Sequence, residues 1–367
     1  MDRTKWERKR IEEVCEKASS NIVLNKIEGN VGDYPLYGAS GYVKSVDFFH
    51  MERPYVGIVK DGAGVGRVGI YPARSSLVGT MQYILPKKDC LLQYLSYGLQ
   101  SLHLDKHMSG ATIPHIYFKN YGKEMIPFPP LPHQKAIVAE LDKLNDVIAL
   151  KRKQLADLDS LAQSLFYEMF GDPQVNEKGW EVKKLGEVCE IGTGSTPDRN
   201  NNSYYKGNNP WVKSTEVCNC AIYDVQEHIS DDALIKTNCR LYPINTILMA
   251  MYGQGKTRGQ IAILKIVAST NQAVAAILPS NCFKPEYLYE HLRLMYENIR
   301  LMARGGNQAN LNLSLVKSIK VMLPPLPLQQ SFAAKITKIE AEKQRVKSSL
   351  KDLETLLASR MQYWFDN

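Results

Sequence analysis

The sequence lacks long apolar runs, a signal-peptide core and paired cysteine motifs, and each absence argues against a class of protein. No apolar run in its 367 residues reaches the roughly 18 that a membrane-spanning helix needs, so we expect no membrane partner. The segment Met1–Trp6 has no apolar signal-peptide core. The seven cysteines are odd in number and form no C-x-x-C. We therefore expect no disulfide framework and no metal site, and a cytoplasmic protein.

Positive charge is in modest excess. There are 46 basic and 38 acidic side chains, a net charge of +8. Residues 1–130 carry +4 and residues 171–325 carry +3, whereas the intervening residues 131–170 carry −1 and residues 326–367 carry +2. Most of the excess thus lies in two separate parts, which favours two small contacts with a polyanion over one continuous basic groove.

The chain contains an internal repeat. Trp6–Glu16 and Trp180–Glu190 are identical at seven of eleven positions, at an offset of 174. Pro129–Gln134 and Pro324–Gln329 both begin Pro-Pro-Leu-Pro and end in Gln, at an offset of 195. The offset grows by 21 between the two matches, so we expect the second copy to carry about 21 extra residues in its middle.

A third match lies inside the two copies. Gly62–Arg67 and Gly253–Arg258 both read G-x-G-x-x-R and both follow an apolar run. Short β-rich runs between Gly- and Asn-rich turns surround them, and each copy also has one helical stretch, near Leu91–Lys106 and Glu286–Ala303. We therefore expect α+β domains with an irregular, partly antiparallel sheet.

A long stretch of helical period without Pro or Gly follows each Pro-Pro-Leu-Pro. The first runs from about His133 to Phe170 and stops at Gly171-Asp172-Pro173, and the second runs from about Leu328 to the end. Each would be roughly 57 Å long at 1.5 Å per residue. Apolar residues at alternating steps of four and three predict a coiled-coil seam, made of Ile137, Leu141, Leu144, Ile148, Leu155, Leu158 and Leu165 in the first helix and Phe332, Ile336, Ile339, Val346, Leu350, Leu353, Leu357 and Trp364 in the second.

Sequential copies allow these helices to pair antiparallel about a pseudo-twofold axis, with facing residue numbers summing to about 501. Ile148 would then face Leu353, and Leu155 would face Val346. Lys151, Lys343 and Arg360 interrupt the two seams. The two Pro-Pro-Leu-Pro segments also fit ligands of SH3 domains. Their position directly before a helix favours a rigid bend and a helix start instead.

The resulting architecture is α+β, with two tandem globular domains, each followed by a long helix, and an antiparallel coiled coil between the helices. The expected ranges are 1–130 for the first domain, 131–172 for the central helix, 173–325 for the second domain and 326–367 for the C-terminal helix.

Several motifs suggest catalysis or cofactor binding but lack the context that such sites need. Ala250–Thr257 fits a loose phosphate loop and Gly64–Gly69 fits the dinucleotide pattern, yet a strand or a proline follows where a helix should begin. His103 and His107 have metal-capable spacing without a further ligand pair. Methyltransferase and nuclease signatures are missing. Two basic domains on a long spacer are more typical of a protein that contacts two separated sites than of a catalyst.

In this order, the features resemble a type I restriction–modification specificity subunit over nearly the whole chain. The resemblance rests on the tandem layout, the Pro-Pro-Leu-Pro lead-ins, the seam helices, and the segments Gly192–Pro197, Asn271–Val274, Gly110–Ile116 and Gly305–Leu311. The first copy departs from the pattern, because Gly38–Tyr42 stands where Gly192–Pro197 has its place. We therefore expect the two halves to read different sequences.

The resemblance implies that each globular part is a target recognition domain that reads one half of a split site in double-stranded DNA. The helices would set the unread spacer and dock two methyltransferase subunits, which would carry S-adenosylmethionine chemistry on adenine. Motor-nuclease subunits could join them to cut unmodified DNA. The chain itself would be non-catalytic and would hold no cofactor.

Candidate DNA contacts follow from side-chain chemistry, because Arg reads guanine, Asn and Gln read adenine, and Lys, Ser and Thr often hold phosphates. They are Lys44, Lys60, Arg67 and Arg74 in the first domain and Thr196, Arg199, Lys206, Lys213, Gln254, Lys256 and Arg258 in the second. Each also fits an ordinary solvated or capping residue.

Two other functions remain open from the residues alone. One is a coiled-coil scaffold or regulator that binds partner proteins, with incidental DNA binding. The other is an enzyme whose site the motifs do not show. A specificity subunit would bind DNA and protect two short patches of it. A scaffold would bind partner proteins without a preference for any DNA sequence, and an enzyme would show turnover as the isolated chain.

Overall fold

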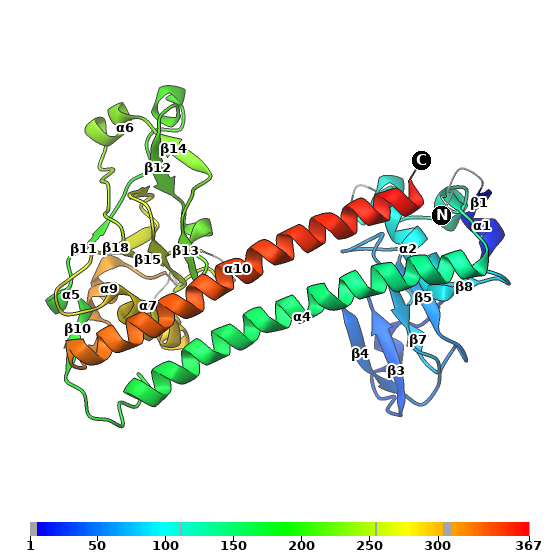
Figure 1. Cartoon of the computed structure of the whole chain (residues 1–367), viewed down its shortest axis with the longest axis horizontal. Helices are drawn as coiled ribbons and strands as arrows, with labels where there is room; N and C mark the ends of the chain where they lie inside the picture. Colours follow the sequence, from blue (N-terminus) through cyan, green and yellow to red (C-terminus); the bar gives the residue numbers. More distant parts are fainter. Residues whose placement is uncertain (1–5, 111, 254, 304–309, 367) are drawn as a thin grey trace. The chain divides into compact units, whose positions relative to one another are not determined.

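A computed structural model of the chain describes residues 6–110, 112–253, 255–303 and 310–366 (Figure 1). Gln254 and most of the Gly305–Leu311 segment lie outside the described residues. The chain forms two compact units, the first made of Met1–Arg152 with Ser348–Asn367 and the second of Lys153–Lys347. Each unit therefore contains one globular part and half of each long helix.

Two helices of 40 residues, α4 (Leu131–Phe170) and α10 (Leu326–Phe365), begin inside the Pro-Pro-Leu-Pro motifs. Pro132 and Pro327 thus occupy the first helical turn, where a backbone N–H has no partner within the helix and its loss costs nothing. Helix α4 ends before Gly171, whose φ of +81° suits glycine.

The long helices pack antiparallel in each unit. In the first unit, Arg360 of α10 donates a hydrogen bond of 3.1 Å to Glu140 of α4. In the second unit, the Lys343 ammonium lies 2.7 Å from the Asp159 carboxylate. Both pairs agree with the register in which facing numbers sum to about 501, so the antiparallel coiled coil is confirmed. Two of the polar residues that interrupt the seams therefore form ion pairs between the helices.

All fifteen seam side chains are buried or half-buried. In the first unit Ile137 and Leu141 join a core with Trp364, and in the second Phe332 packs against Phe166 of α4. The buried positions are Ile137, Leu141, Ile148, Phe332, Ile336, Val346 and Trp364, and the half-buried ones are Leu144, Leu155, Leu158, Leu165, Ile339, Leu350, Leu353 and Leu357.

The globular part of the first unit is α+β. One antiparallel sheet has the strand order β2-β8-β5-β6, a second has the order β4-β3-β7 with a parallel β3–β7 pair, and β1 pairs with β9. The elements are β1 (Arg8–Arg10), α1 (Ile11–Val14), β2 (Cys15–Ser19), η2 (Leu24–Ile27), β3 (Tyr34–Gly38), β4 (Gly41–Val46), β5 (Tyr55–Val59), β6 (Val68–Tyr71), β7 (Ser76–Leu77), β8 (Met81–Pro86), α2 (Leu92–Ser101), η3 (Leu104–His107), α3 (Phe118–Tyr121) and β9 (Met125–Pro127).

The second unit repeats this topology with additions. Its main sheet has the order β11-β18-β15-β16-β13, its second sheet has the order β14-β12-β17, and β10 pairs with β19. The elements are β10 (Val182–Lys184), α5 (Leu185–Val188), β11 (Ile191–Thr193), η4 (Asn202–Tyr205), β12 (Asn209–Val212), η5 (Ser214–Glu216), β13 (Cys220–Ile222), β14 (Glu227–Ile229), α6 (Asp231–Lys236), β15 (Ile247–Ala250), β16 (Ile261–Leu264), β17 (Ser269–Thr270), β18 (Val274–Ile277), α7 (Pro285–Leu294), α8 (Tyr296–Leu301), α9 (Leu313–Ser318) and β19 (Lys320–Met322).

The strand pairings locate most of the extra residues of the second copy. Leu36 and Trp211 hold equivalent places in their sheets, as do Val56 and Ile247. Leu36 and Val56 are 20 residues apart in the first copy, and Trp211 and Ile247 are 36 apart in the second, so 16 of the 21 extra residues lie in this interval. It contains η5, α6 and the edge strand β13.

The helical stretch that we expected in each copy is broken in the structure. Leu91–Lys106 becomes α2 followed by η3, and Glu286–Ala303 becomes α7 followed by α8. His103 stands at the first break with a φ of +48°, a left-handed conformation that no helix continues.

A buried glutamine ties each long helix to its globular part. Gln134 is fully buried, and its carbonyl accepts the Leu91 N–H at 2.9 Å while its amide donates to the Asp89 and Pro129 carbonyls, each at 2.9 Å. Leu91 is the N-cap residue of α2. One side chain thus satisfies three backbone groups on two segments, which explains why Gln follows the proline motif.

The second unit repeats this contact. Gln329 is also fully buried; it accepts the Lys284 N–H at 2.9 Å and donates to the Cys282 and Pro324 carbonyls at 3.1 and 2.8 Å. Lys284 is the N-cap residue of α7, which corresponds to α2. The same three-way connection therefore orients both long helices.

In the described part of the chain, no helix combines the length and the apolar character needed to cross a membrane.

Replacing Gln329 with Leu leaves three buried backbone groups without a partner. We expect Gln329→Leu to lower the free energy of unfolding by about 3 kcal/mol, measured by urea denaturation. The exposed neighbour Gln330 provides the control, since Gln330→Leu should change stability by less than about 0.5 kcal/mol. Equal effects of the two substitutions would contradict the anchoring role.

His291 of α7 makes the second unit sensitive to acid. It is fully buried beside the rings of Phe166 and Tyr287, and burial lowers its pKa from 6.5 to about 4, with a backbone contact to Lys320 offsetting only part of this. Between pH 6.5 and about 4, His291 is protonated in the unfolded chain but stays neutral in the folded chain. The unit should therefore lose stability as the pH falls from about 6.5 to about 4, by up to about 3 kcal/mol from this residue.

The measurement compares urea denaturation of the wild type and His291→Phe across that pH range. The wild type should lose more stability than the variant, whereas His103→Asn, at an exposed histidine, should follow the wild type. Parallel pH profiles for wild type and His291→Phe would refute the assignment.

Candidate nucleic-acid interface

The two G-x-G-x-x-R motifs lie in equivalent hairpin connections. The first joins β5 to β6 and the second joins β15 to β16, and both strand pairs are antiparallel. Gly62, Gly64 and Gly66 have φ values between 83° and 88°, a region that side chains with a Cβ rarely adopt. A strand, β6 or β16, follows each motif, whereas the phosphate-binding loops that the motifs resemble lead into a helix N-terminus.

A matching backbone hydrogen bond braces each hairpin. The Ile116 N–H donates to the Lys60 carbonyl at 2.9 Å, and the Leu311 N–H donates to the Met251 carbonyl at 3.0 Å. Ile116 and Leu311 end the two segments, Gly110–Ile116 and Gly305–Leu311, that aligned at the offset of 195. This shared contact gives those segments a structural reason to recur.

Helix α8 adds a second support to the β15–β16 hairpin. The Tyr296 hydroxyl donates to the Lys256 carbonyl at 2.6 Å, and Arg300 donates to the Gly255 carbonyl at 2.9 Å. Arg300 also donates to the Tyr296 hydroxyl at 2.6 Å. Sequence reasoning missed both residues; their spacing of four on a helix was visible, but nothing tied that helix to the hairpin.

Basic side chains of these hairpins reach the surface. Lys256 is exposed, and Arg258 is half-buried, with its Nε buried and without a hydrogen-bond partner in the described part of the chain. In the first unit Arg67 is exposed and bonds only weakly to its own loop, at 3.3 Å to the Gly64 carbonyl. The hairpins thus offer cations on a braced backbone.

Thr196 lies at the same edge of the second unit's main sheet as the β15–β16 hairpin. Strand β11 ends at Thr193, opposite the first residues of β18, which in turn pair with the end of β15. The Thr196 hydroxyl donates to the side-chain oxygen of Gln272, which follows β17. Gln272 was not a candidate, although it stands in the Asn271–Val274 segment and its amide chemistry suits adenine.

Arg199 and Lys213 share one carboxylate. Arg199 lies 2.7 Å and Lys213 lies 2.8 Å from Glu227, and their hydrogen bonds, from Lys213 first, hold the pKa of Glu227 below its ordinary value. The Arg199 guanidinium also lies over the rings of Tyr205 and Trp211, at 4.3 and 5.0 Å. Both cations therefore pair with a carboxylate of the second sheet, and Arg199 also packs against a ring of that sheet.

Three candidates of the first unit also have internal partners. Lys44 donates to the carbonyls of Ile27 and Glu28 at the end of η2, at 3.0 and 2.9 Å. Lys60 lies 3.5 Å from Asp61, and Arg74, whose φ is +51°, lies 4.0 Å from Glu52. Lys206 of the second unit is exposed, and Gln254 lies outside the described residues. The structure therefore gathers Thr196, Lys256 and Arg258 at one edge of the main sheet and places Arg199, Lys206 and Lys213 in the connections beside the second sheet.

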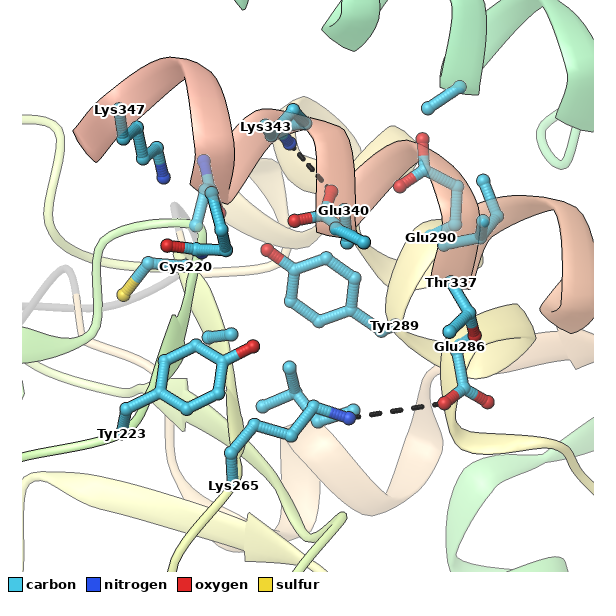
Figure 2. Close-up of a pocket in the computed structure, with 17 residues that line it drawn as sticks. Cys220, Tyr223, Lys265, Glu286, Tyr289, Glu290, Thr337, Glu340, Lys343 and Lys347 are labelled. Atoms are coloured by element: carbon cyan, nitrogen blue, oxygen red, sulfur yellow. Dashed lines mark hydrogen bonds and ion pairs between the residues drawn. The ribbon is translucent and has the colours of Figure 1, made fainter. Parts of the chain in front are cut away.

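A cavity of about 280 Å³ lies in the second unit against β13, β16, α7 and α10 (Figure 2). Two ion pairs line it, because Lys265 lies 3.9 Å from Glu286 and Lys343 lies 2.6 Å from Glu340. Within the residues that the structure describes, three or more His, Cys, Asp or Glu side chains nowhere gather as metal ligands would.

The chain is similar to known proteins over both copies. The family model described as "Type I restriction modification DNA specificity domain" matches residues 3–160 and 177–353. The MjaIX type I restriction enzyme specificity subunit of Methanocaldococcus jannaschii is 24% identical over 269 residues, which are 68% of this chain and 62% of that protein. The EcoR124I/EcoR124II specificity subunit of Escherichia coli is 24% identical over 75% of this chain and 70% of its own length.

Solved structures share the fold. The type I restriction–modification system S subunit from M. genitalium superposes with a TM-score of 0.65, at 15% identity, over 99% of this chain and 96% of that one. A chain from a study of complex assembly and conformational transition of the type I system superposes with a TM-score of 0.54, at 16% identity, over 97% and 96% of the two chains.

The structural role of Arg199 can be measured. Arg199→Ala should lower the free energy of unfolding by about 1 kcal/mol, because Glu227 loses a partner and two rings lose a cation. Lys206→Ala, which removes an exposed cation, should change stability by less than about 0.5 kcal/mol. Urea denaturation measures both, and an Arg199→Ala protein as stable as the wild type would show that the cluster contributes nothing to folding.

Proposed function

Because the chain belongs to the type I restriction–modification DNA specificity family, we propose that it is the non-catalytic subunit that gives such a complex its DNA sequence specificity. Each unit would read one half of a bipartite site in double-stranded DNA. The observation that supports this most is the pair of equivalent hairpins, each braced from the same side and each presenting cations at the same edge of its own sheet.

The rigidity of these hairpins suits sequence reading. A side chain that distinguishes bases must hold its position, and the backbone hydrogen bonds at Lys60 and Met251 limit how far each hairpin can move. The two hairpins nevertheless differ in sequence, Ala-Gly-Val-Gly against Gln-Gly-Lys-Thr before the shared Arg. Different side chains on equivalent frames fit two different half-sites.

The long helices would set the spacer between the half-sites and dock two methyltransferase subunits. Large apolar side chains on their outer faces support docking, since Leu150 is 64%, Leu161 is 52% and Leu356 is 46% exposed. The partners would bring S-adenosylmethionine for adenine methylation, and motor-nuclease subunits would add DNA cleavage. This chain would contribute neither cofactor nor catalytic group, and it would act on chromosomal and incoming DNA in the cytoplasm.

Arg258→Ala and Arg67→Ala test whether each unit reads one half of the DNA site. We expect Arg258→Ala to weaken binding about tenfold through one half-site and Arg67→Ala to weaken it through the other, because a lost base contact costs about 1–3 kcal/mol. Lys256→Ala should lower affinity for all sequences and reduce the slope of log affinity against log salt by about 1. Footprinting and titration at several salt concentrations measure these effects.

Arg345→Ala is the matched control, because Arg345 is an exposed arginine on α10 with its side chain 80% accessible. It should leave both half-sites protected. If Arg258→Ala and Arg67→Ala weakened protection of the same half-site, or if the chain and its methyltransferase partners showed no sequence preference at all, the proposal would be wrong and a scaffold function would be favoured.

A further inference from the structure

Cys218 and Cys220 form a close thiol pair in the second unit. Their sulfur atoms are 3.5 Å apart, and Asn219 between them has a φ of +54°, which folds the C-x-C segment into a tight bend. A disulfide has an S–S length of about 2.05 Å, so closing the bond needs a movement of only about 1.5 Å. The bend therefore places the two thiols close to bonding distance.

This pair differs from the other cysteines in access. All seven cysteines lie in the described part of the chain, and Cys218 is the only exposed one. Cys15, Cys90, Cys189 and Cys239 are buried. Burial raises the pKa of Cys220 to about 11, and nearby Lys347 lowers it in part. Cys218 is thus the group that an external reagent meets first, with Cys220 next to it on the rim of the cavity (Figure 2).

The pair also lies beside the base of the β15–β16 hairpin. The Asn219 side-chain oxygen accepts the Ile261 N–H at 3.2 Å, and Cys220 pairs with Ala262 in the parallel β13–β16 ladder. Ile261 opens β16, three residues after Arg258. The Cys218–Cys220 bend is therefore in direct contact with the strand that follows the hairpin.

We propose that Cys218 and Cys220 form a reversible disulfide by exchange with low-molecular-weight disulfides, and that this bond alters how the second unit holds its hairpin. The Cys218 thiolate attacks one sulfur of the small disulfide and releases one small thiol. Cys220 then gives its proton to solvent and attacks the Cys218 sulfur of the mixed disulfide, which expels the second small thiol. One disulfide and two protein thiols become one protein disulfide and two small thiols.

The consequence for recognition rests on the proposed function. Closing the bond pulls Cys218 and Cys220 together and displaces Asn219, which would weaken its hydrogen bond to Ile261. Loss of one such bond would change affinity about fivefold. The change should appear in the half-site that Arg258 reads and not in the other, because β13 belongs to the insertion of the second copy.

The experiment equilibrates the full chain with mixtures of reduced and oxidised glutathione and maps the products by peptide mass spectrometry. The wild type should show one disulfide within the peptide that holds both cysteines, fully reversed by excess reduced glutathione. Cys220→Ser should instead retain glutathione on Cys218, because nothing resolves the mixed disulfide. Cys282→Ser, at a half-buried cysteine elsewhere, should behave as the wild type.

Two results would overturn the proposal. A wild type that keeps glutathione on Cys218 as stably as Cys220→Ser would exclude exchange within the pair. A disulfide that forms without changing affinity for either half-site would exclude the link to the hairpin. DNA binding by the fully reduced protein is measured alongside, and its absence would refute the proposed function while leaving the thiol chemistry intact.

Discussion

The hydrogen bonds of two buried glutamines are the constraint on which the architecture depends. Gln134 and Gln329 each join the start of a long helix, the loop before it and the N-cap of a helix in the globular part. A long helix in isolation would swing freely against the domain that precedes it. Because a buried amide loses about 1–3 kcal/mol for each unmet partner, the three-way contact holds that junction in one geometry. The same junction recurs at the start of both long helices.

Much of this was predictable from the residues, for physical reasons. Helical period and seam spacing depend on local geometry, so the two helices and their antiparallel register followed from residue numbers. The ion pairs of Lys343 with Asp159 and of Arg360 with Glu140 did not, because the seam pattern gave those two residues no acidic partner. The role of Gln134 did not follow, because its partner Leu91 is 43 residues away and no local pattern links them. The breaks after α2 and α7 were missed because tertiary contacts override the continuous helical propensity there.

Surface chemistry was the weakest part of the prediction. Residue type marked Arg199 and Lys213 as anion binders, yet both form ion pairs with one carboxylate, that of Glu227, 14 residues from Lys213. Arg67, Lys256 and Arg258 differ because their hairpins carry no acidic side chain between the strands of the second copy and only Asp61 in the first. The segment of the second copy that contains β13 also contains Cys218 and Cys220, so the extra sheet edge and the close thiol pair lie together.

The central claim is that this chain directs modification to a split DNA sequence. Sequencing of methylated adenines in cells with and without the gene tests it most directly. The account predicts that deletion removes methylation from one motif made of two short specific halves separated by a fixed run of unread bases, and that restoring the gene restores it. An unchanged methylation pattern, or loss at an uninterrupted motif, would contradict the account.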